Sequence, residues 1–264
     1  MVQQLSKSQE AALHPIAVDY PDSDGQPMSD NTEQFKWIVT IKENLELIYA
    51  QAPDVFVAGD LLWYPVEGNN KIRQAPDAMV AFGRPKGYRG SYMQWKENNV
   101  SPQVVFEILS PGNRRAEMAR KLLFYERYGV EEYYEYDPDN VELIGLKREG
   151  SGLEAIETID GWTSPRLNIR FEITPETLVL YRPDGLPFLT YVELGQRLDE
   201  TSQRLDETSQ RLDETSQRLD ETSQRLDETS QRLDETSQQL SQSQAENAKL
   251  VERLKALGVD PSEL

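Results

Sequence analysis

The sequence predicts an α/β protein with a mixed central sheet flanked by helices, followed by one long C-terminal helix. Two short apolar runs, AMVAF at 78–82 and QVVFEIL at 103–109, are rich in Val, Ile and Phe and too short for helices, which is typical of buried strands. Apolar residues recur at helical spacing before and after these runs, at 31–49 and 114–128. The heptapeptide RLDETSQ then repeats six times without change from Arg197 to Gln238, which is typical of a coiled coil.

The composition excludes several kinds of site. Among 264 residues there is no cysteine, so disulfides, thiolate metal sites and a cysteine nucleophile are ruled out. The single histidine, His14, leaves no basis for a zinc site rich in histidine or for a triad that depends on one. Because no apolar run is long enough to cross a bilayer and the N-terminus lacks the apolar core of a signal peptide, we expect a cytoplasmic protein without membrane contact.

The net charge of the chain restricts how it could bind nucleic acid. The formal net charge is −18, with 19 basic and 30 acidic residues in 1–194 and 9 basic and 16 acidic residues in 195–264. Proteins that hold nucleic acid through phosphate contacts usually have a basic surface. A nucleic-acid-binding function would therefore need locally concentrated basic residues or a metal ion that offsets charge; the alternative is a different substrate.

The chain begins with an expected irregular arm at 1–30, which is polar and contains three prolines and a turn at Asp24–Gly25. The first helix follows, capped within Ser29–Asn31 and ended before Pro53. The helix carries three acidic residues, Glu33, Glu43 and Glu46. Either all three are solvated, or one of them is directed to a functional site.

Residues 31–194 are predicted to form the folded domain. The run 54–66 predicts two strands with a break at Gly59–Asp60. Helix 114–128 starts after the turn at 110–113, and its inward side is expected to carry Met118, Leu122 and Tyr125, with Leu123 as a further candidate. Strands are expected further on, at 130–136, 141–148, 153–159 and 166–171, and 174–194 adds a short helix or strand.

Two carboxylates accompany the buried strands. Asp77 opens the run 78–82 and Glu107 lies inside the run 103–109. Burying a carboxylate costs several kcal/mol unless it is paired, hydrogen-bonded or bound to a cation. Two such groups supply the hard oxygen ligands that Mg²⁺ prefers, and Asp60 is an alternative acid that is more often structural at such a turn.

The order of these residues resembles the Uma-two family of restriction-endonuclease-like proteins, a branch of the PD-(D/E)XK nuclease superfamily. The resemblance covers roughly residues 15–194. It implies an α-β-β-β-α-β core and a site in which Asp77, Glu107 and the backbone carbonyl of Ile108 hold Mg²⁺ or Mn²⁺. The residues that carry it are Pro76-Asp77, Glu107 with Ser110-Pro111, Lys121, Tyr125, and Gly129-Val130 with the Glu-Glu-Tyr-Tyr that follows.

One position departs from the superfamily pattern. The superfamily lysine lies two residues after the second acid, where this chain has Leu109. The resemblance implies that Lys121, on the next helix, reaches back to assist the attacking water together with Asp77 and Glu107. The alternative is a solvated lysine on an amphipathic helix.

Basic residues near these motifs are candidate contacts for a phosphate backbone. Arg84, Lys86 and Arg89 lie in a loop with glycines and aromatics, and Arg114 and Arg115 lie at the start of the second helix. The alternative for 83–101 is a surface loop with a short amphipathic helix.

The tail at 195–257 is expected to form a coiled coil, with 258–264 as a short end. With Leu198 and its repeats at heptad position a, threonine occupies every d position of the repeats, and Asn247 falls at a. Threonine makes a weak seam, so a single solvated helix or an expanded repeat without a role are alternatives. Arg at every g position favours a parallel homodimer or higher homo-oligomer.

Two main functions follow from these observations, and a hydrolase that uses the same metal site on a substrate other than DNA is a third. The first is a metal-dependent endonuclease that cleaves nucleic acid, with DNA as the substrate that the resemblance implies. The second is a nuclease-fold protein that is inactive and works as a binding or scaffold protein through its coiled coil. The intact acid pair with Lys121 favours the first, and the acidic charge and the shifted lysine favour the second.

Overall fold

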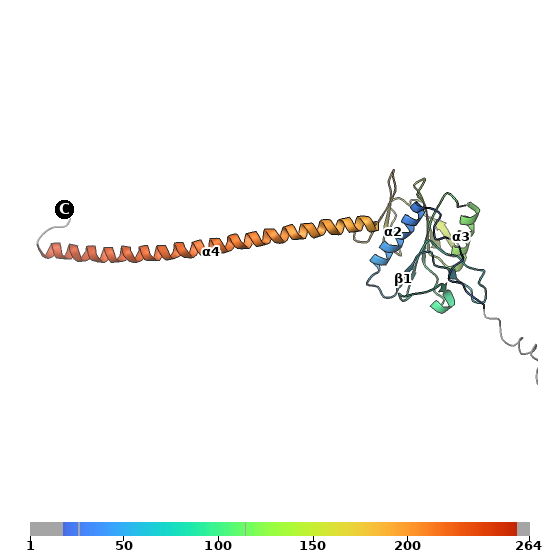
Figure 1. Ribbon diagram of the computed structural model, residues 1–264, viewed down its shortest axis with the longest axis horizontal. Coiled ribbons are helices and arrows are strands. Elements are labelled where there is room, and N and C mark those ends of the chain that lie inside the picture. The colour runs from blue at the N-terminus through green and yellow to red at the C-terminus, as the bar shows by residue number, and fades with distance from the viewer. Residues whose placement is uncertain (1–17, 26, 114, 258–264) are drawn as a thin grey trace, which may run out of the picture. The chain divides into compact units, whose positions relative to one another are not determined.

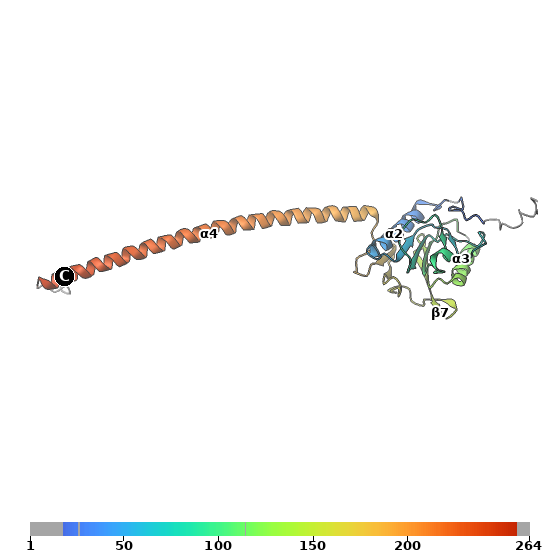
Figure 2. The same cartoon turned by 90° about the horizontal axis from the view of Figure 1, so that it is seen from below.

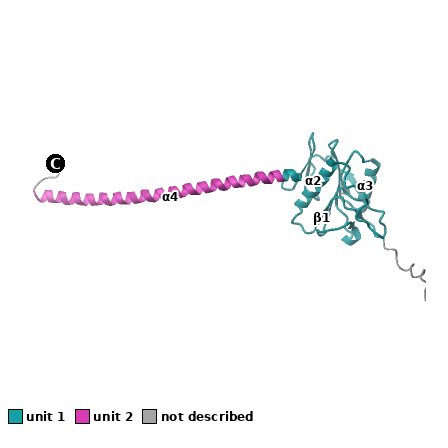
Figure 3. Cartoon of the chain, viewed as in Figure 1, with its two compact units in different colours: residues 1–194 teal, residues 195–264 magenta. Residues whose placement is uncertain are grey.

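The structure is a computed structural model that describes residues 18–25, 27–113 and 115–257. The chain divides into two compact units, Met1–Leu194 and Gly195–Leu264 (Figure 3). Part of the expected arm, 1–17, and the expected end, 258–264, lie outside the described residues.

A mixed sheet of six strands forms the centre of the first unit, in the order β1-β3-β5-β6-β7-β8 (Figure 1). Strands β5 and β6 pair in parallel and their other neighbours in the sheet pair antiparallel, which confirms the predicted fold class. The strands are β1 (Val55–Ala58), β3 (Ala78–Phe82), β5 (Val104–Ile108), β6 (Glu132–Asp137), β7 (Glu142–Glu149) and β8 (Gly152–Ala155).

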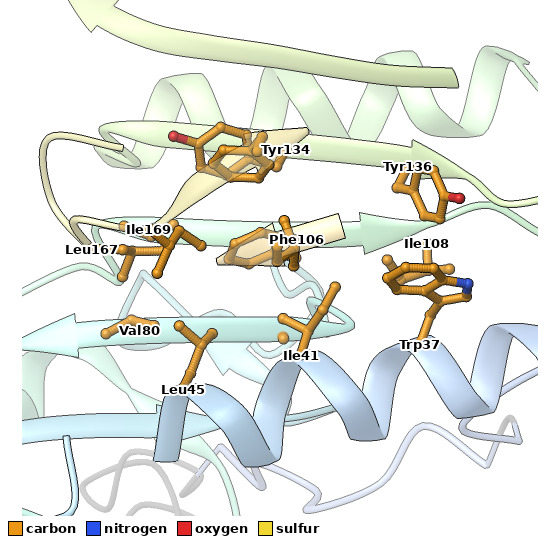
Figure 4. Close-up of a cluster of buried hydrophobic side chains, with 14 of the residues drawn as sticks. Trp37, Ile41, Leu45, Val80, Phe106, Ile108, Tyr134, Tyr136, Leu167 and Ile169 are labelled. Atoms are coloured by element: carbon orange, nitrogen blue, oxygen red, sulfur yellow. The ribbon is translucent and has the colours of Figure 1, made fainter. Parts of the chain in front are cut away.

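Helices cover both faces of this sheet. Helix α2 (Thr32–Ile48) packs on one face and α3 (Arg115–Tyr128) on the other (Figure 2). Side chains of a strand alternate between the two faces, so Phe106 and Ile108 join the core under α2 whereas Val105 joins the core under α3. Figure 4 shows the first core, in which the inward stripe of α2 meets these strands. Glu107 lies on the α3 face, because it alternates with Phe106 and Ile108.

Helix α2 begins where a polar cap meets its apolar stripe. The side chain of Asn31 accepts a hydrogen bond from the backbone N–H of Gln34, as the predicted cap requires. The buried stripe then runs through Trp37, Ile41 and Leu45. The first buried residue of the stripe is polar, because Gln34 occupies that position.

The second strand expected in 54–66 does not join the central sheet. Asp60 has a φ of 46°, in the left-handed region, and its N–H donates to the carbonyl of Pro76, so the chain turns away after β1. The next segment, β2 (Trp63–Tyr64), pairs in parallel with β4 (Tyr92–Met93) as a separate sheet. Asp77 therefore precedes the second strand of the central sheet in chain order, not the third as expected.

Strand β6 is buried on both faces, although its alternation of Glu and Tyr predicts a half-exposed strand. Hydrogen bonds explain the difference, because each buried polar group finds a partner. Glu132 accepts from the hydroxyls of Tyr134 and Ser164 and from the N–H of Arg166. This carboxylate thus joins β6 to the loop that precedes β9 (Arg170–Ile173).

A hairpin of β9 (Arg170–Ile173) and β10 (Leu178–Tyr181) adds Phe171 and Leu180 to the core under α2. The last element, α4 (Tyr191–Ala256), begins with a reciprocal pair of hydrogen bonds between Thr190 and Glu193, the capping-box arrangement. None of the helices described is long and apolar enough to cross a membrane.

Candidate functional site

The site centres on two acidic residues that the antiparallel register brings opposite each other. Ala78 pairs with Phe106 across β3 and β5, so the residues one step outward are Asp77 and Glu107. Alternation directs both to the α3 face of the sheet. The contact between the strands is direct, because the N–H of Ile108 donates to Oδ2 of Asp77 at 2.6 Å. Both side chains are buried, Asp77 at 7% and Glu107 at 1% exposure.

Helix α3 supplies the partners of Glu107. Lys121 Nζ lies 2.7 Å from Oε2 of Glu107, and the hydroxyl of Tyr125 donates to Oε1. The two partners are four residues apart and therefore lie on one face of the helix. Tyr125 belongs to the buried stripe of α3 and Lys121 borders it, so the packing of this helix on the sheet brings both groups to the carboxylate.

The two carboxyl groups hold protons more tightly than ordinary acids do. Burial raises the pKa of Asp77 well above its usual value, and the charge of Glu107 raises it further, against the opposing effects of Lys121 and the Ile108 N–H. Burial likewise raises the pKa of Glu107, although the charge of Lys121 and the hydrogen bonds from Lys121 and Tyr125 lower it. One lysine therefore does not fully offset two buried acids.

Lys121 itself is held in its charged form. Burial alone would lower the pKa of its ammonium group, but the carboxylates of Glu107 and Asp77 outweigh burial, and the pKa is raised. A lysine with a raised pKa is a hydrogen-bond donor at neutral pH and not a base.

A hollow of about 230 Å³ opens beside α3 and contains both Asp77 and Lys121. A larger hollow of about 760 Å³ lies on the other side of α3, lined by Met118, Leu122 and Glu135 among others, and contains neither of them. We take the smaller hollow as the candidate site because Asp77 and Lys121 line it; Glu107 does not line it and is linked to it through its ion pair with Lys121. Its other polar side chains are Asp24, Ser29, Asp30, Gln34, Asp60, Gln74, Asn113 and Glu117.

Residues 24–175, more than half of the chain, match the Uma2 family, described as "Putative restriction endonuclease". The chain belongs to this family. A crystal structure of a protein from Anabaena variabilis, described as "a putative nuclease belonging to DUF820", is similar over 61% of this chain and 89% of that chain, with 13% sequence identity and a TM-score of 0.40. At this level of likeness it says nothing about individual site residues. No curated protein matches the chain.

The donor set of the candidate site fits a hard divalent cation in its chemistry. Asp77, Glu107 and the carbonyl of Ile108 offer only oxygen atoms, and water fills the remaining positions of Mg²⁺ in such sites. The second oxygen of Asp77 accepts no hydrogen bond from any described residue. The Ile108 carbonyl already accepts Nε2 of Gln34 at 2.8 Å, which leaves one of its lone pairs. In the described ranges no three His, Cys, Asp or Glu residues gather closely enough to hold a metal without such other donors.

Sequence reasoning missed Gln34. The acids of α2 drew attention, whereas the group that reaches the site is an amide, with its Oε1 accepting from Asp30 N–H and its Nε2 donating to Ile108. Two signals were present: Asn31 and Gln34 have capping-box spacing, and Gln34 falls on the apolar stripe. Asp60, considered as an alternative acid, does line the hollow, and burial raises its pKa.

The basic residues proposed for nucleic-acid contacts have different surroundings. Arg84 and Arg89 both bind the carboxylate of Glu97, at 2.8 and 2.6 Å, and the Arg89 guanidinium lies over the ring of Phe56. Lys86 pairs with Glu46 at 2.7 Å. Arg115 is exposed at the start of α3 and lines the larger hollow, while Arg114 lies outside the described residues. Arg84 and Arg89 thus hold their own loop together.

Proposed function

We propose that the chain is a metal-dependent endonuclease that hydrolyses phosphodiester bonds of nucleic acid, with DNA as the first substrate to test. Asp77 and Glu107 would hold Mg²⁺ or Mn²⁺ together with the Ile108 carbonyl, and Lys121 would act on the phosphate and the attacking water. The observation that carries the proposal is the meeting of these charged side chains from β3, β5 and α3 in one place. Membership of the Uma2 family supports it.

The electrostatics of the acid pair support a cation. Two buried carboxylates with raised pKa values are costly to ionise together, and a proton or a cation relieves that cost. The hollow beside Asp77 gives a cation and its waters access from solvent. A structural acid pair would have no need of such an opening. Perturbed carboxylates in a cleft are also a general mark of functional sites.

The protein groups would divide the work. A bound divalent cation polarises the phosphate and lowers the pKa of a bound water. The Ile108 N–H holds Oδ2 of Asp77, so the other carboxylate oxygen, Oδ1, could bind a cation without a change of side-chain rotamer. Lys121 is protonated, and we assign it the donation of a hydrogen bond to the phosphate or the water, not proton removal. Tyr125 holds the Glu107 carboxylate in place during this step.

The substrate must approach an acidic protein. The net charge of −18 repels phosphate at long range, so the cation and Lys121 would supply the attraction at short range. We therefore expect weak binding of nucleic acid without divalent cations. The proposal places the enzyme in the cytoplasm and includes association of the chain with itself through residues 195–257.

Cleavage assays test the proposal. Supercoiled plasmid and single-stranded DNA are incubated with Mg²⁺ or Mn²⁺ and the full chain, alongside Asp77→Asn, Glu107→Gln and Lys121→Met. We expect nicking by the wild type and a loss of at least about 100-fold in each variant, as is typical when an electrostatic catalytic group is removed. Lys36→Met, an exposed lysine paired with Glu33 on α2, serves as the matched control and should retain full activity.

Folding is checked separately by circular dichroism and thermal melting, so that a lost fold is not counted as lost catalysis. Equal cleavage by wild type and Asp77→Asn would show that a contaminant or another site cuts the DNA. A well-folded wild type that cuts neither DNA nor RNA with either cation would overturn the proposal. The scaffold alternative would then take its place.

A further inference from the structure

The long helix α4 exposes one continuous stripe of leucines. Seven leucines recur every seven residues, and each is 60–71% exposed. They are Leu198, Leu205, Leu212, Leu219, Leu226, Leu233 and Leu240. A repeat of seven residues keeps such a stripe on one side of a supercoiled helix over roughly 63 Å, which is the geometry of a helix that pairs lengthwise with another.

The threonines between the leucines are adapted to such a partner. In all six repeats the Thr hydroxyl donates to the carbonyl of the Arg four residues earlier, at 2.7 Å, from Thr201 to Thr236. A hydroxyl buried without a partner would cost free energy, but these hydroxyls are already satisfied within their own helix. What each d position offers to a neighbouring helix is therefore the methyl group. The seam is leucine and methyl, and it is less polar than the sequence alone indicates.

Charges beside the seam fix the direction of pairing. Every g position of the repeats is Arg and every e position is Ser, as in Arg204 and Ser202. In an antiparallel pair the g positions face each other, which sets Arg against Arg along the whole repeat. In a parallel pair each Arg faces a Ser. Glu200 and four of its five equivalents lie four residues before an Arg of the same helix, so their charges support that helix and do not require a partner of opposite charge.

The six identical repeats do not specify which heptads meet, because a shift of one heptad restores the same pattern. The last turns break this degeneracy. Asn247 falls at an a position, and Leu250, Leu254 and Leu257 follow at d, a and d. A polar Asn at one a position pairs best with itself and favours two strands over larger assemblies.

We propose that two copies of this chain pair through α4 as a parallel, in-register coiled coil whose register is set by the segment 240–257. The occupant of the leucine stripe is thus the same stripe of a second copy. Both copies of the Met1–Leu194 unit are then joined to the same end of the pair. The inference rests on the self-association proposed above and not on nuclease activity.

Mass measurement tests the pairing. Sedimentation equilibrium of the full chain should give twice the chain mass of 30.3 kDa. The variant with Leu219→Lys and Leu226→Lys should sediment as a monomer, with its helix content retained by circular dichroism because Lys is a good helix former. The matched control, Gln217→Lys with Gln224→Lys, adds the same charge at f positions and should remain a dimer. A monomeric wild type, a larger assembly, or a dimer that survives the leucine changes would overturn the pairing.

Disulfide cross-linking tests the direction and the register of the pair. Because the chain has no native cysteine, only the introduced cysteines can cross-link. Thr201→Cys and Leu250→Cys each place one cysteine at a d position near opposite ends of α4. In a parallel, in-register pair, both variants should form disulfide-linked dimers with themselves, since facing Cα atoms then lie within the few ångströms a disulfide spans. A slip of one heptad separates the cysteines by roughly 10 Å, and an antiparallel pair separates them further.

The readouts separate the claims. A dimer by mass in which neither variant cross-links would refute direction and register while leaving self-association intact. In the Asn247→Leu background, we expect the cross-linking yield of Thr201→Cys to fall, because slipped registers become equivalent. An unchanged yield would remove Asn247 from the assignment of register. None of these outcomes depends on DNA cleavage.

Discussion

The ammonium group of Lys121 lies 2.7 Å from the carboxylate of Glu107, fourteen residues earlier in the chain and on a different element. Only 1% of the Glu107 side chain and 14% of the Lys121 side chain are exposed. An ion pair at this depth contributes to stability, because removing one partner leaves a buried charge uncompensated. The same pair joins α3 to β5 and also contains two of the three proposed catalytic residues.

Replacing Lys121 by Met should therefore cost stability as well as activity. Without a cation, we expect the free energy of unfolding at neutral pH to fall by about 3 kcal/mol, because Glu107 then keeps only Tyr125 as a partner. Urea unfolding monitored by circular dichroism measures this loss. The double variant Lys121→Met with Glu107→Gln should recover much of it, since the carboxylate that Lys121 compensated is then also removed. Lys36→Met, whose side chain is 55% exposed, should change stability by less than about 0.5 kcal/mol.

The contradicting result would be a Lys121→Met variant as stable as the wild type. The ion pair would then be a solvated contact, and Lys121 could not be regarded as held against Glu107.

Unlike the replacement of Lys121, the replacement of Asp77 should increase stability while it removes function. Its pKa is raised by burial and by Glu107, so the ionised carboxylate strains the metal-free protein. Asp77→Asn keeps an oxygen for the Ile108 N–H but removes the charge, and we expect it to stabilise the metal-free protein by about 1 kcal/mol. Adding Mn²⁺ should raise the melting temperature of the wild type and leave that of the variant unchanged.

Thermal melting with and without Mn²⁺, after chelator treatment, checks both parts. Asp54→Asn, at an exposed acid just before β1, is the control and should respond to Mn²⁺ as the wild type does. A variant at Asp77 that is less stable than the wild type and still gains stability from Mn²⁺ would place the cation elsewhere.

Gln34 should matter to the site although it carries no charge. Its amide donates to the Ile108 carbonyl and accepts from Asp30, so Gln34→Leu leaves a buried carbonyl without its partner. We expect a loss of roughly 2 kcal/mol in the free energy of unfolding and a smaller Mn²⁺-induced rise in melting temperature. Gln51→Leu, at an exposed position beyond α2, is the control. A Gln34→Leu variant with wild-type stability would show that water replaces the amide without cost.

These residues show what local pattern can and cannot predict. Asp77 and Glu107 are visible in the sequence because a carboxylate beside a short Val- and Phe-rich run conflicts with burial. Gln34 is not visible in that way, because an amide on an amphipathic helix is equally compatible with solvent. Its role depends on where α2 crosses the end of β5, and the hydrogen bond spans 74 residues of sequence.

Two further differences have the same origin. Trp63–Tyr64 has the composition of a core strand, but its neighbour in space, Tyr92–Met93, lies outside the central sheet. Glu132 belongs to a pattern typical of a half-exposed strand, and it is buried because Ser164 and Arg166 arrive from a distant loop. Short-range periodicity predicts the elements, whereas partners far along the chain decide the burial of polar groups.

Glu97 offers a test that is independent of the candidate site. Its carboxylate receives Arg84 at 2.8 Å and Arg89 at 2.6 Å, and these two guanidinium groups lower its pKa despite the opposing effect of burial. A carboxyl group with a lowered folded-state pKa contributes stability that is present above its unfolded value, near 4.5, and is lost as the pH falls through the folded-state pKa. Glu97→Gln should therefore cost about 1 to 2 kcal/mol at neutral pH.

The cost should shrink as the pH falls below about 4.5, the unfolded-state value, and should vanish below the lowered folded-state pKa, where the folded wild type also loses the charge of Glu97. Urea unfolding of both proteins at a series of pH values from about 7 to about 3 measures the difference. Glu43→Gln, at a carboxylate that is 61% exposed on α2, should show a difference near zero throughout. If the difference for Glu97→Gln does not change with pH, the two arginines do not depend on this carboxylate, and they become available again as contacts for a phosphate backbone.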